Sequence, residues 1–239
     1  MTEGKQVKSK QRVADHGEVF TAEREVNAML DLVKNETERI DSRFLEPACG
    51  DGNFLAEILR RKLAVVNKKY GGIRKRADYE MWSVIAVMSI YGVEILSDNA
   101  VACRKRLFGI WDEAYTTNCK KDSKDNCREV VRFILERNIL CGNALTLMID
   151  KSNEPIVFSE WCLLSGGMVK RTDYTLTEML EQDVPEPDII PMVQEKSKMT
   201  EEQLTLIETG EDEKKDEGTI VKQFPPIHYL RLLEQQEGE

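Results

Sequence analysis

The 239-residue sequence lacks any hydrophobic run long enough to cross a membrane. A membrane-spanning helix needs about 18–20 consecutive apolar residues, and the most apolar stretch, Met81–Val93, is shorter than that. The first residues, 1–5, are not followed by the apolar core of a signal peptide. We therefore expect a protein with no membrane partner.

The sequence also lacks any Cys-x-x-Cys pair, although it contains six cysteines. Closely spaced pairs are typical of zinc sites, and regular cysteine frameworks are typical of disulfide-bonded secreted domains. Neither pattern is present, so we expect no metal centre and a reducing, cytoplasmic setting. At this length the chain can form one substantial core, since domains commonly contain about 100–200 residues.

Basic charge is scarce overall, because the net charge is −9, which argues against a protein that coats nucleic acid by charge alone. Segment 58–77 is the exception, with eight basic residues and no acidic one. A solvated helix face followed by a loop would give the same pattern, so DNA contact remains one of two interpretations. The candidate contacts to DNA phosphates are Lys68, Lys69, Arg74, Lys75 and Arg76.

Residues 44–55 read FLEPACGDGNFL, an acid and two glycines between apolar flanks. Glycine permits a tight strand-to-helix reversal and a close backbone approach that a Cβ would block. The N–H groups at the start of the following helix can bind a polar or negatively charged ligand. This pattern is typical of a nucleotide-type ligand loop, and an ordinary corner does not explain why Asp51 and Asn53 flank Gly52.

Helices and short strands alternate along the chain. The spacing of apolar residues predicts helices over 20–33, with Thr21 as N-cap, and over 53–63, 79–89, 98–107 and 128–137. Strands are predicted over 44–45, 90–95, 139–145 and 155–162. This alternation predicts an α/β fold with a parallel sheet and crossover helices. The expected regions are a polar lead (1–15), a cofactor-binding domain (16–183), a Pro-containing then acidic linker (184–219) and an apolar C-terminal segment (220–239).

The glycine-loop segment resembles the first motif of S-adenosylmethionine-dependent DNA methyltransferases, D/E/N-P-A-C-G-x-G-x-F-L. Residues 16–22 resemble the G-x-x-F/Y-T-P segment of the gamma-arrangement, adenine-specific enzymes of restriction–modification systems, with Ala22 in place of proline. Residues 92–95 (GVEI) and 142–145 (GNAL) resemble the second and third motifs. The resemblance covers residues 12–165 and implies a Rossmann-like methyltransferase sheet, truncated or divergent, that binds S-adenosyl-L-methionine.

The resemblance also implies roles for individual residues. Phe20 and Thr21 would lie against the methionine end of the cofactor. Glu94 would accept hydrogen bonds from both ribose hydroxyls, since a carboxylate has only acceptors. Ile95 would pack on the adenine unless it is a core residue, and Asn143 would lie near the adenine amine unless it only ends a strand. The remaining candidate cofactor residues are Glu46, Pro47, Ala48, Gly50, Gly52 and Asn53.

The resemblance fails at the fourth motif of the family, N/D/S-P-P-Y/F/W, which binds the flipped target adenine. No such tetrapeptide occurs in the sequence. The positional candidates for catalysis are Ser159 as the polar contact and Trp161 as the stacking platform, although they could equally be structural. Segment 224–229 (FPPIHY) has the prolines but begins with Phe and lies beyond the acidic linker. We therefore expect the cofactor-binding half of a methyltransferase.

These patterns leave three functional hypotheses. The first is an adenine-type DNA methyltransferase or modification subunit, with DNA as substrate and a divergent substrate loop or one completed by a second subunit. The second is a non-catalytic cofactor-binding module that regulates or scaffolds a restriction or defence complex. The third, a methyltransferase acting on protein or RNA, would make the N-terminal resemblance a coincidence. The first two differ only in the target-base pocket.

Overall fold

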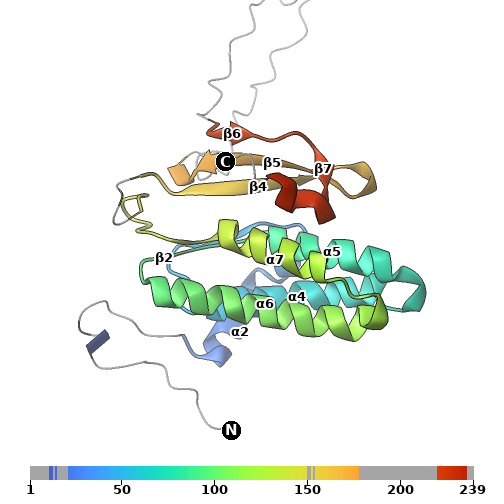
Figure 1. The fold of residues 1–239 in the computed structure, drawn as a ribbon. Helices are drawn as coiled ribbons and strands as arrows, with labels where there is room; N and C mark the ends of the chain where they lie inside the picture. The colour runs from blue at the N-terminus through green and yellow to red at the C-terminus, as the bar shows by residue number, and fades with distance from the viewer. Residues whose placement is uncertain are drawn as a thin grey trace, which may run out of the picture.

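The computed structural model describes residues 11, 12, 14, 21–149, 152, 154–177 and 220–235. Phe20, the linker 184–219 and most of the predicted polar lead lie outside these residues. The described part contains a parallel sheet in the order β1-β2-β3 and an antiparallel sheet in the order β4-β5-β6, with β7 also paired to β5 (Figure 1). The strands are β1 (Phe44–Glu46), β2 (Ile90–Glu94), β3 (Ile139–Cys141), β4 (Val157–Leu163), β5 (Met168–Thr175), β6 (Lys222–Gln223) and β7 (Ile227–His228).

Two helices connect each pair of neighbouring parallel strands. Helices α4 (Asn53–Tyr70) and α5 (Arg76–Met88) join β1 to β2, with the short turn η1 (Ile73–Lys75) between them. Helices α6 (Ser97–Cys119) and α7 (Asp125–Asn138) join β2 to β3, with the turn η2 (Lys120–Asp122) between them. Figure 1 shows these helices side by side and extending well beyond the short strands. The predicted α/β fold with crossover helices is confirmed for the described residues.

Helix α6 is longer than the sequence predicted. Its buried residues continue at four-residue spacing past the expected end, through Trp111, Tyr115 and Cys119. This spacing keeps them on one helix face, toward the core. The aromatic rings of Trp111 and Tyr115 stack with centroids 4.6 Å apart, so the extension adds buried aromatic surface.

The N-terminal helix α2 (Glu23–Leu32) begins one residue later than a cap at Thr21 would place it, and a single turn, α3 (Lys34–Thr37), follows it. Its N-cap is Ala22, whose carbonyl oxygen accepts hydrogen bonds from the N–H groups of Glu25 and Val26. The prediction of Thr21 as N-cap is therefore wrong. The side chains of Val26 and Leu30 are buried in the main core.

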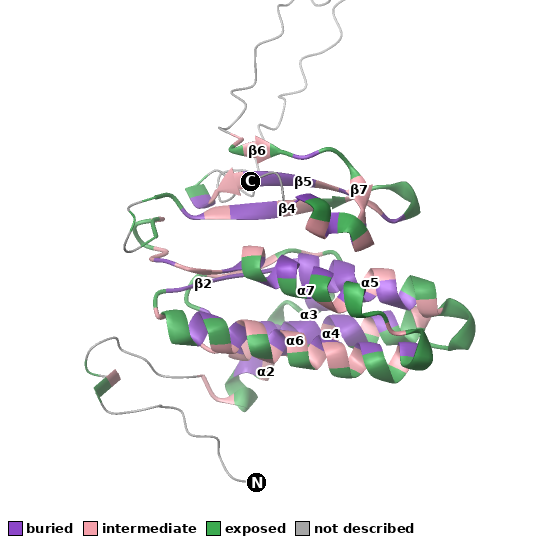
Figure 2. Ribbon diagram, viewed as in Figure 1, coloured by how far each residue is buried: buried purple, intermediate pink, exposed green. Residues whose placement is uncertain are grey.

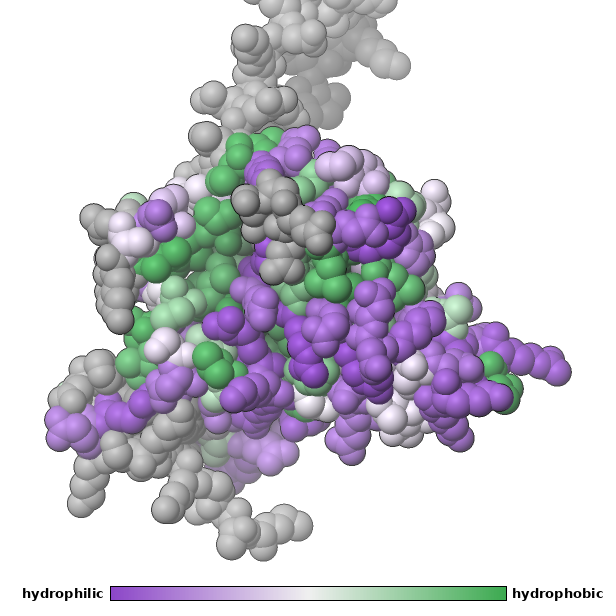
Figure 3. Space-filling model, in the orientation of Figure 1, coloured by the Kyte–Doolittle hydropathy of each residue, from purple (hydrophilic) through white to green (hydrophobic). Residues whose placement is uncertain are grey.

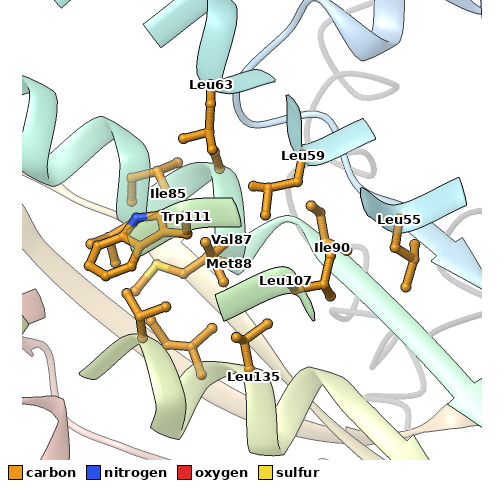
Figure 4. Packing of buried hydrophobic residues seen from close by; sticks show 14 of the residues in the cluster. Leu55, Leu59, Leu63, Ile85, Val87, Met88, Ile90, Leu107, Trp111 and Leu135 are labelled. Carbon is orange, nitrogen blue, oxygen red and sulfur yellow. The ribbon is translucent and has the colours of Figure 1, made fainter. Parts of the chain in front are cut away.

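The main core lies between the helices of the two crossovers. Figure 4 shows side chains from α4, α5, α6 and α7 pointing toward one another around Trp111 and Met88. Figure 2 shows that the buried residues line the inner sides of these helices and continue into β4 and β5. Trp111 is fully buried, and its indole N–H donates to the hydroxyl of Ser83 at 3.1 Å.

The antiparallel sheet covers one face of β2. Since successive side chains of a strand point to opposite faces, Tyr91 and Val93 share that face, where they form a second core with Ile156 and Phe158. The Tyr91 hydroxyl donates to the carbonyl oxygen of Ser159 at 3.1 Å. The strand predicted over 155–162 therefore exists as β4, but it does not join the parallel sheet.

The short turn after β4 explains why this strand pairs with its next neighbour in the chain. Strand β4 pairs antiparallel with β5 along its whole length, from Val157↔Thr175 to Leu163↔Val169. The connecting turn η3 (Ser165–Gly167) contains two glycines with positive φ, Gly166 at 68° and Gly167 at 75°. A tight turn of this kind suffices for an antiparallel pair, whereas a parallel neighbour needs a crossover.

The C-terminal segment folds back onto the same unit. Strands β6 and β7 pair with β5, and η4 (Tyr229–Gln235) packs against α7. The buried carboxylate of Glu80 in α5 accepts hydrogen bonds from the hydroxyls of Tyr229 at 2.8 Å and Tyr115 at 2.5 Å, and it pairs with Lys124. Tyr229 thereby joins the C-terminal segment to α5.

None of the helices in the described part of the chain combines the length and the hydrophobicity that a bilayer span requires. In Figure 3 the face that carries α6 is mainly hydrophilic, while hydrophobic side chains gather above it, toward the antiparallel sheet. The outer side of α6 is thus a solvent face.

Candidate cofactor site

The glycine loop lies directly on β2 and α6. Gly50 and Gly52 have φ values of 54° and 89°, which side chains with a Cβ rarely adopt. A Cβ on Gly52 would lie 2.7 Å from the sulfur of Cys103 in α6. A Cβ on Gly92 in β2 would lie 2.9 Å from the sulfur of Cys49 in the loop. Gly52 and Gly92 therefore allow the loop to pack closely against α6 and β2, whether or not a ligand is bound.

Glu94, at the carboxyl end of β2, is held beneath this loop. Its side chain is buried, with a relative exposure of 7% for the residue. One carboxylate oxygen accepts from the N–H of Gly50 at 2.8 Å, and the other accepts from the N–H of Leu96 at 2.9 Å. Because a carboxylate oxygen has two lone pairs, each oxygen keeps capacity for one further donor. The arrangement is a fixed acceptor pair.

Ile95 and Asn143 lie at the same sheet edge as Glu94. The side chain of Ile95 projects outward, with 46% of the residue exposed. Asn143 comes next to this edge because the N–H of Gly142 donates to the carbonyl oxygen of Glu94 at 3.0 Å. The side-chain oxygen of Asn143 accepts from the N–H of Leu145 at 2.9 Å. That oxygen is therefore already used within its own turn.

Thr21 also reaches the loop. Its carbonyl oxygen accepts from the side-chain amide of Asn53 at 3.2 Å. Arg106 in α6 donates to the amide oxygen of Asn53 at 2.6 Å and pairs with Asp51 at 3.3 Å. Arg106 was not found from the sequence, because it lies more than fifty residues from the loop. It gives Asp51 and Asn53 a structural role that the sequence had left unexplained.

Two side chains of the loop, Glu46 and Cys49, have pKa values shifted toward their neutral forms. Burial raises the pKa of Glu46. A hydrogen bond with the thiol of Cys103 is the largest cause, and burial the second, of a pKa of Cys49 far above its usual range. A thiol is a much weaker nucleophile than a thiolate, so Cys49 acts as a packing residue. The described residues contain no group of three or more His, Cys, Asp or Glu side chains arranged to hold a metal ion, and all six cysteines are free.

Ser159 and Trp161 are in β4 and make contacts within the fold. The hydroxyl of Ser159 donates to Asp173 at 2.7 Å and accepts from Arg171 at 3.0 Å, and all three side chains are buried. The indole N–H of Trp161 donates to the side-chain oxygen of Asn138 at 2.9 Å. Both side chains therefore have hydrogen-bond partners within the fold.

The candidate DNA-binding residues lie at the far end of α4. In Figure 1 the α4–α5 turn is at the right end of the helices, while β2 is at the left. Lys68 is about 22 Å along the helix axis from Asn53, at 1.5 Å per residue. Arg76 is half-buried and pairs with Asp122. We call the four exposed residues the basic cluster: Lys68, Lys69, Arg74 and Lys75.

Lys62 comes from the same basic segment but is fully buried. Its ammonium group donates to the carbonyl oxygens of Ile40 at 3.1 Å and of Ser42, and to the hydroxyl of Ser89 at 2.7 Å. Burial lowers the pKa of Lys62 to about 7. Lys62 therefore anchors the segment before β1 and does not face phosphate.

Residues 20–156 match the family model described as the MmeI DNA-methyltransferase domain. The match covers more than half of the chain, from the segment before α2 to the start of β4, so the chain belongs to this family of DNA-methyltransferase domains. It includes the glycine loop, Glu94 and Asn143.

A search of curated proteins adds a relative from Methanocaldococcus jannaschii, named "Putative type II restriction enzyme and methyltransferase RM.MjaORFECS2P". It is 32% identical over 122 residues, which is 50% of this chain and 10% of the relative. The chain thus spans about a tenth of that relative's length. No solved structure matches the chain.

Proposed function

We propose that the chain is the S-adenosylmethionine-binding part of an adenine-type DNA methyltransferase or modification subunit in a restriction or defence system. The observation that carries this proposal is the position of Glu94 beneath the glycine loop, with one carboxylate oxygen 2.8 Å from the N–H of Gly50. Membership of a DNA-methyltransferase family supports the same conclusion and disfavours a methyltransferase of protein or RNA.

The residues at this edge fit the chemistry of the proposed cofactor. The second lone pairs on the two oxygens of Glu94 suit the two ribose hydroxyls, which are donors at adjacent carbons. The exposed side chain of Ile95 follows immediately and offers an apolar surface for the adenine ring. The loop from Glu46 to Asn53, together with Thr21 and Phe20, would hold the methionine end. When bound, the cofactor supplies a methyl group on a positively charged sulfur.

The target base requires groups that the described residues do not provide at this edge. An exocyclic amine must be held in line with the methyl donor, and the base must leave the duplex. Ser159 and Trp161 remain the positional candidates by sequence, but their side chains are engaged with Asp173, Arg171 and Asn138. We therefore place the base-binding groups on polypeptide outside the described residues, either in a divergent substrate loop or in a second subunit.

The same contacts favour a second candidate function. If no partner supplies a base pocket, the chain is a non-catalytic cofactor-binding module that regulates or scaffolds a restriction or defence complex. Both candidates share DNA as the partner, with the basic cluster as the proposed contact to phosphates, and both suit the cytoplasm. They differ in whether methyl groups reach DNA.

Two measurements test the proposal in order. Titration calorimetry of the chain with S-adenosylmethionine, and separately with its demethylated product, should show one binding site. Transfer of radiolabelled methyl groups to mixed-sequence DNA, with and without neighbouring gene products, then separates enzyme from module. Absence of cofactor binding by the folded chain would contradict both candidate functions. Tight binding without methyl transfer under either condition would leave only the module.

A further inference from the structure

Two side chains of α6, one helical turn apart, reach the glycine loop. Cys103 packs on the loop at Gly52, where a Cβ would lie 2.7 Å from its sulfur. Arg106 follows three residues later on the same face of the helix, and it contacts the residues on either side of Gly52. The loop therefore meets α6 at three consecutive positions.

The contacts of Arg106 with the loop use one nitrogen of its guanidinium group. Nη1 donates to the side-chain oxygen of Asn53 at 2.6 Å and to the carboxylate of Asp51 at 3.3 Å. The side chain of Arg106 is 35% exposed and that of Asp51 is 31% exposed, so solvent screens this ion pair and it contributes little by itself. The short, charge-assisted bond to Asn53 is the stronger contact.

The side-chain amide of Asn53 carries this contact to a second segment. Because an arginine has only donors, it binds the oxygen end of the amide. The NH₂ end then faces the other way and donates to the carbonyl oxygen of Thr21 at 3.2 Å. Asn53 is also the first residue of α4. Arg106, Asn53 and Thr21 therefore form a chain of hydrogen bonds that joins α6, the loop and the segment before α2.

This chain of hydrogen bonds acts on a part of the loop whose conformation needs support. Gly52 has a φ of 89°, and a glycine has more backbone freedom to lose than any other residue. Its neighbours Asp51 and Asn53 are both held by the same nitrogen of Arg106. A binding loop that is already held in one conformation loses less freedom when its ligand arrives, and it binds that ligand more tightly.

We propose that Arg106 is a positioning residue of the cofactor site. It holds the glycine loop and, through Asn53, the Thr21 segment in the arrangement that binds the methionine end of S-adenosylmethionine. The inference rests on the proposed function, which assigns the methionine end to these two segments. Arg106 acts through Asn53 and does not contact the cofactor.

The position of α6 does not depend on Arg106. Leu107 and Trp111 of the same helix are fully buried in the main core. Removing the guanidinium group therefore leaves α6 in place and frees the loop. The affinity for the cofactor should fall more than the stability of the fold.

The test compares Arg106→Met with Lys105→Met in the full chain. Methionine keeps the apolar stem of either side chain and removes the charge and the donors. Lys105 is the preceding residue of α6 and is exposed, so it is the matched control. Titration calorimetry measures the dissociation constants of S-adenosylmethionine, its demethylated product and adenosine. Urea denaturation measures the stability of each variant, and affinities are compared where every variant is folded.

The proposal expects Arg106→Met to raise the dissociation constants of S-adenosylmethionine and of its demethylated product about tenfold or more, because both ligands carry the amino-acid end. Adenosine lacks that end, so its affinity should stay within about twofold of the wild type. Lys105→Met should change none of the three affinities. Arg106→Lys should fall between the wild type and Arg106→Met, because one charged nitrogen makes both contacts. In the Asn53→Ala background, which breaks the chain of hydrogen bonds, Arg106→Met should add only about twofold or less.

An affinity of Arg106→Met for S-adenosylmethionine within about twofold of the wild type would overturn the proposal, whatever the stability of the variant. An equal loss for adenosine would also overturn it, as would an undiminished loss in the Asn53→Ala background. Should Arg106→Met not fold, Arg106→Lys and Asn53→Ala give the same comparison, since each weakens the chain of hydrogen bonds. Absence of cofactor binding by the folded wild-type chain would refute the proposed function as well, whereas wild-type binding that Arg106→Met retains would refute only this inference.

Discussion

Replacing Glu94 by Gln tests the proposed cofactor site with a minimal change of shape. The wild-type carboxylate accepts from the N–H groups of Gly50 and Leu96 at 2.8 and 2.9 Å. A Gln side chain has one oxygen and one NH₂ group. One of the two backbone N–H groups would therefore face another donor, and one ribose hydroxyl would lose its charged acceptor.

The size of the effect follows from these losses. An unsatisfied backbone donor in this setting costs about 1–3 kcal/mol of folding free energy. A hydrogen bond to a charged group contributes about 1.5–3 kcal/mol, so the dissociation constant of S-adenosylmethionine should rise about 10- to 100-fold. Calorimetry measures the affinity, and urea denaturation measures the stability. Glu113→Gln, on an exposed position of α6, is the matched control.

Two outcomes would refute this reasoning. An affinity of Glu94→Gln within about twofold of the wild type would show that the ribose does not bind at Glu94. A similar loss in Glu113→Gln would show that the effect is not specific to this edge. Gly52→Val is a poorer test, because the added Cβ would collide with Cys103 whether or not a ligand is bound.

Three further predictions concern residues outside the loop. Because the pKa of Lys62 is lowered to about 7 in the folded chain and is about 10.4 when unfolded, the unfolded state binds more protons between these values and stability rises with pH. The unfolding free energy of the wild type should thus gain about 2 kcal/mol over Lys62→Met from pH 7 to pH 9, and parallel urea profiles would contradict this. Ser159→Ala and Trp161→Phe should each lower the melting temperature but leave the cofactor affinity unchanged; a loss of methyl transfer without a loss of stability would instead support their catalytic role. Reversing the charges of the basic cluster should weaken DNA binding and flatten its dependence on salt, and an unchanged salt slope would show that the cluster is only a solvated surface.

The sequence predicted the parallel sheet because each of its features has a local signature. The helices follow from apolar spacing, and the loop follows from Gly50 and Gly52, whose positive φ values need glycine. The proximity of Glu94 to the loop follows because the carboxyl ends of parallel strands lie at the same edge of a sheet.

Strand β5 has a local signature only in the glycine turn that precedes it, not in its own residues. Strand β5 reads MVKRTDYT, and its central residues Arg171, Thr172 and Asp173 are buried. Buried charged side chains are rare unless they are paired, so a polar strand is read from sequence as a surface segment. Here Arg171 donates to Asp173 at 2.6 Å, and its guanidinium lies over the ring of Phe224, which comes from the C-terminal segment. The burial of this polar strand depends on a contact with the C-terminal segment, which no local pattern encodes.

The unpaired outer side of β1 divides the proposed site into two parts with different requirements. Glu94 ends β2, which has neighbours on both sides, and Ile95 follows it directly. The residues proposed for the adenosine therefore lie within the described part of the chain. The part proposed for the methionine lies above β1, whose outer side is unpaired in the described chain. A methyl group bound there would face the unpaired outer side of β1. We therefore expect cofactor binding to depend mainly on this chain. Transfer to a base would depend on the polypeptide that supplies the base-binding groups. The same chain would then act in an enzyme or in a regulatory module according to its partner.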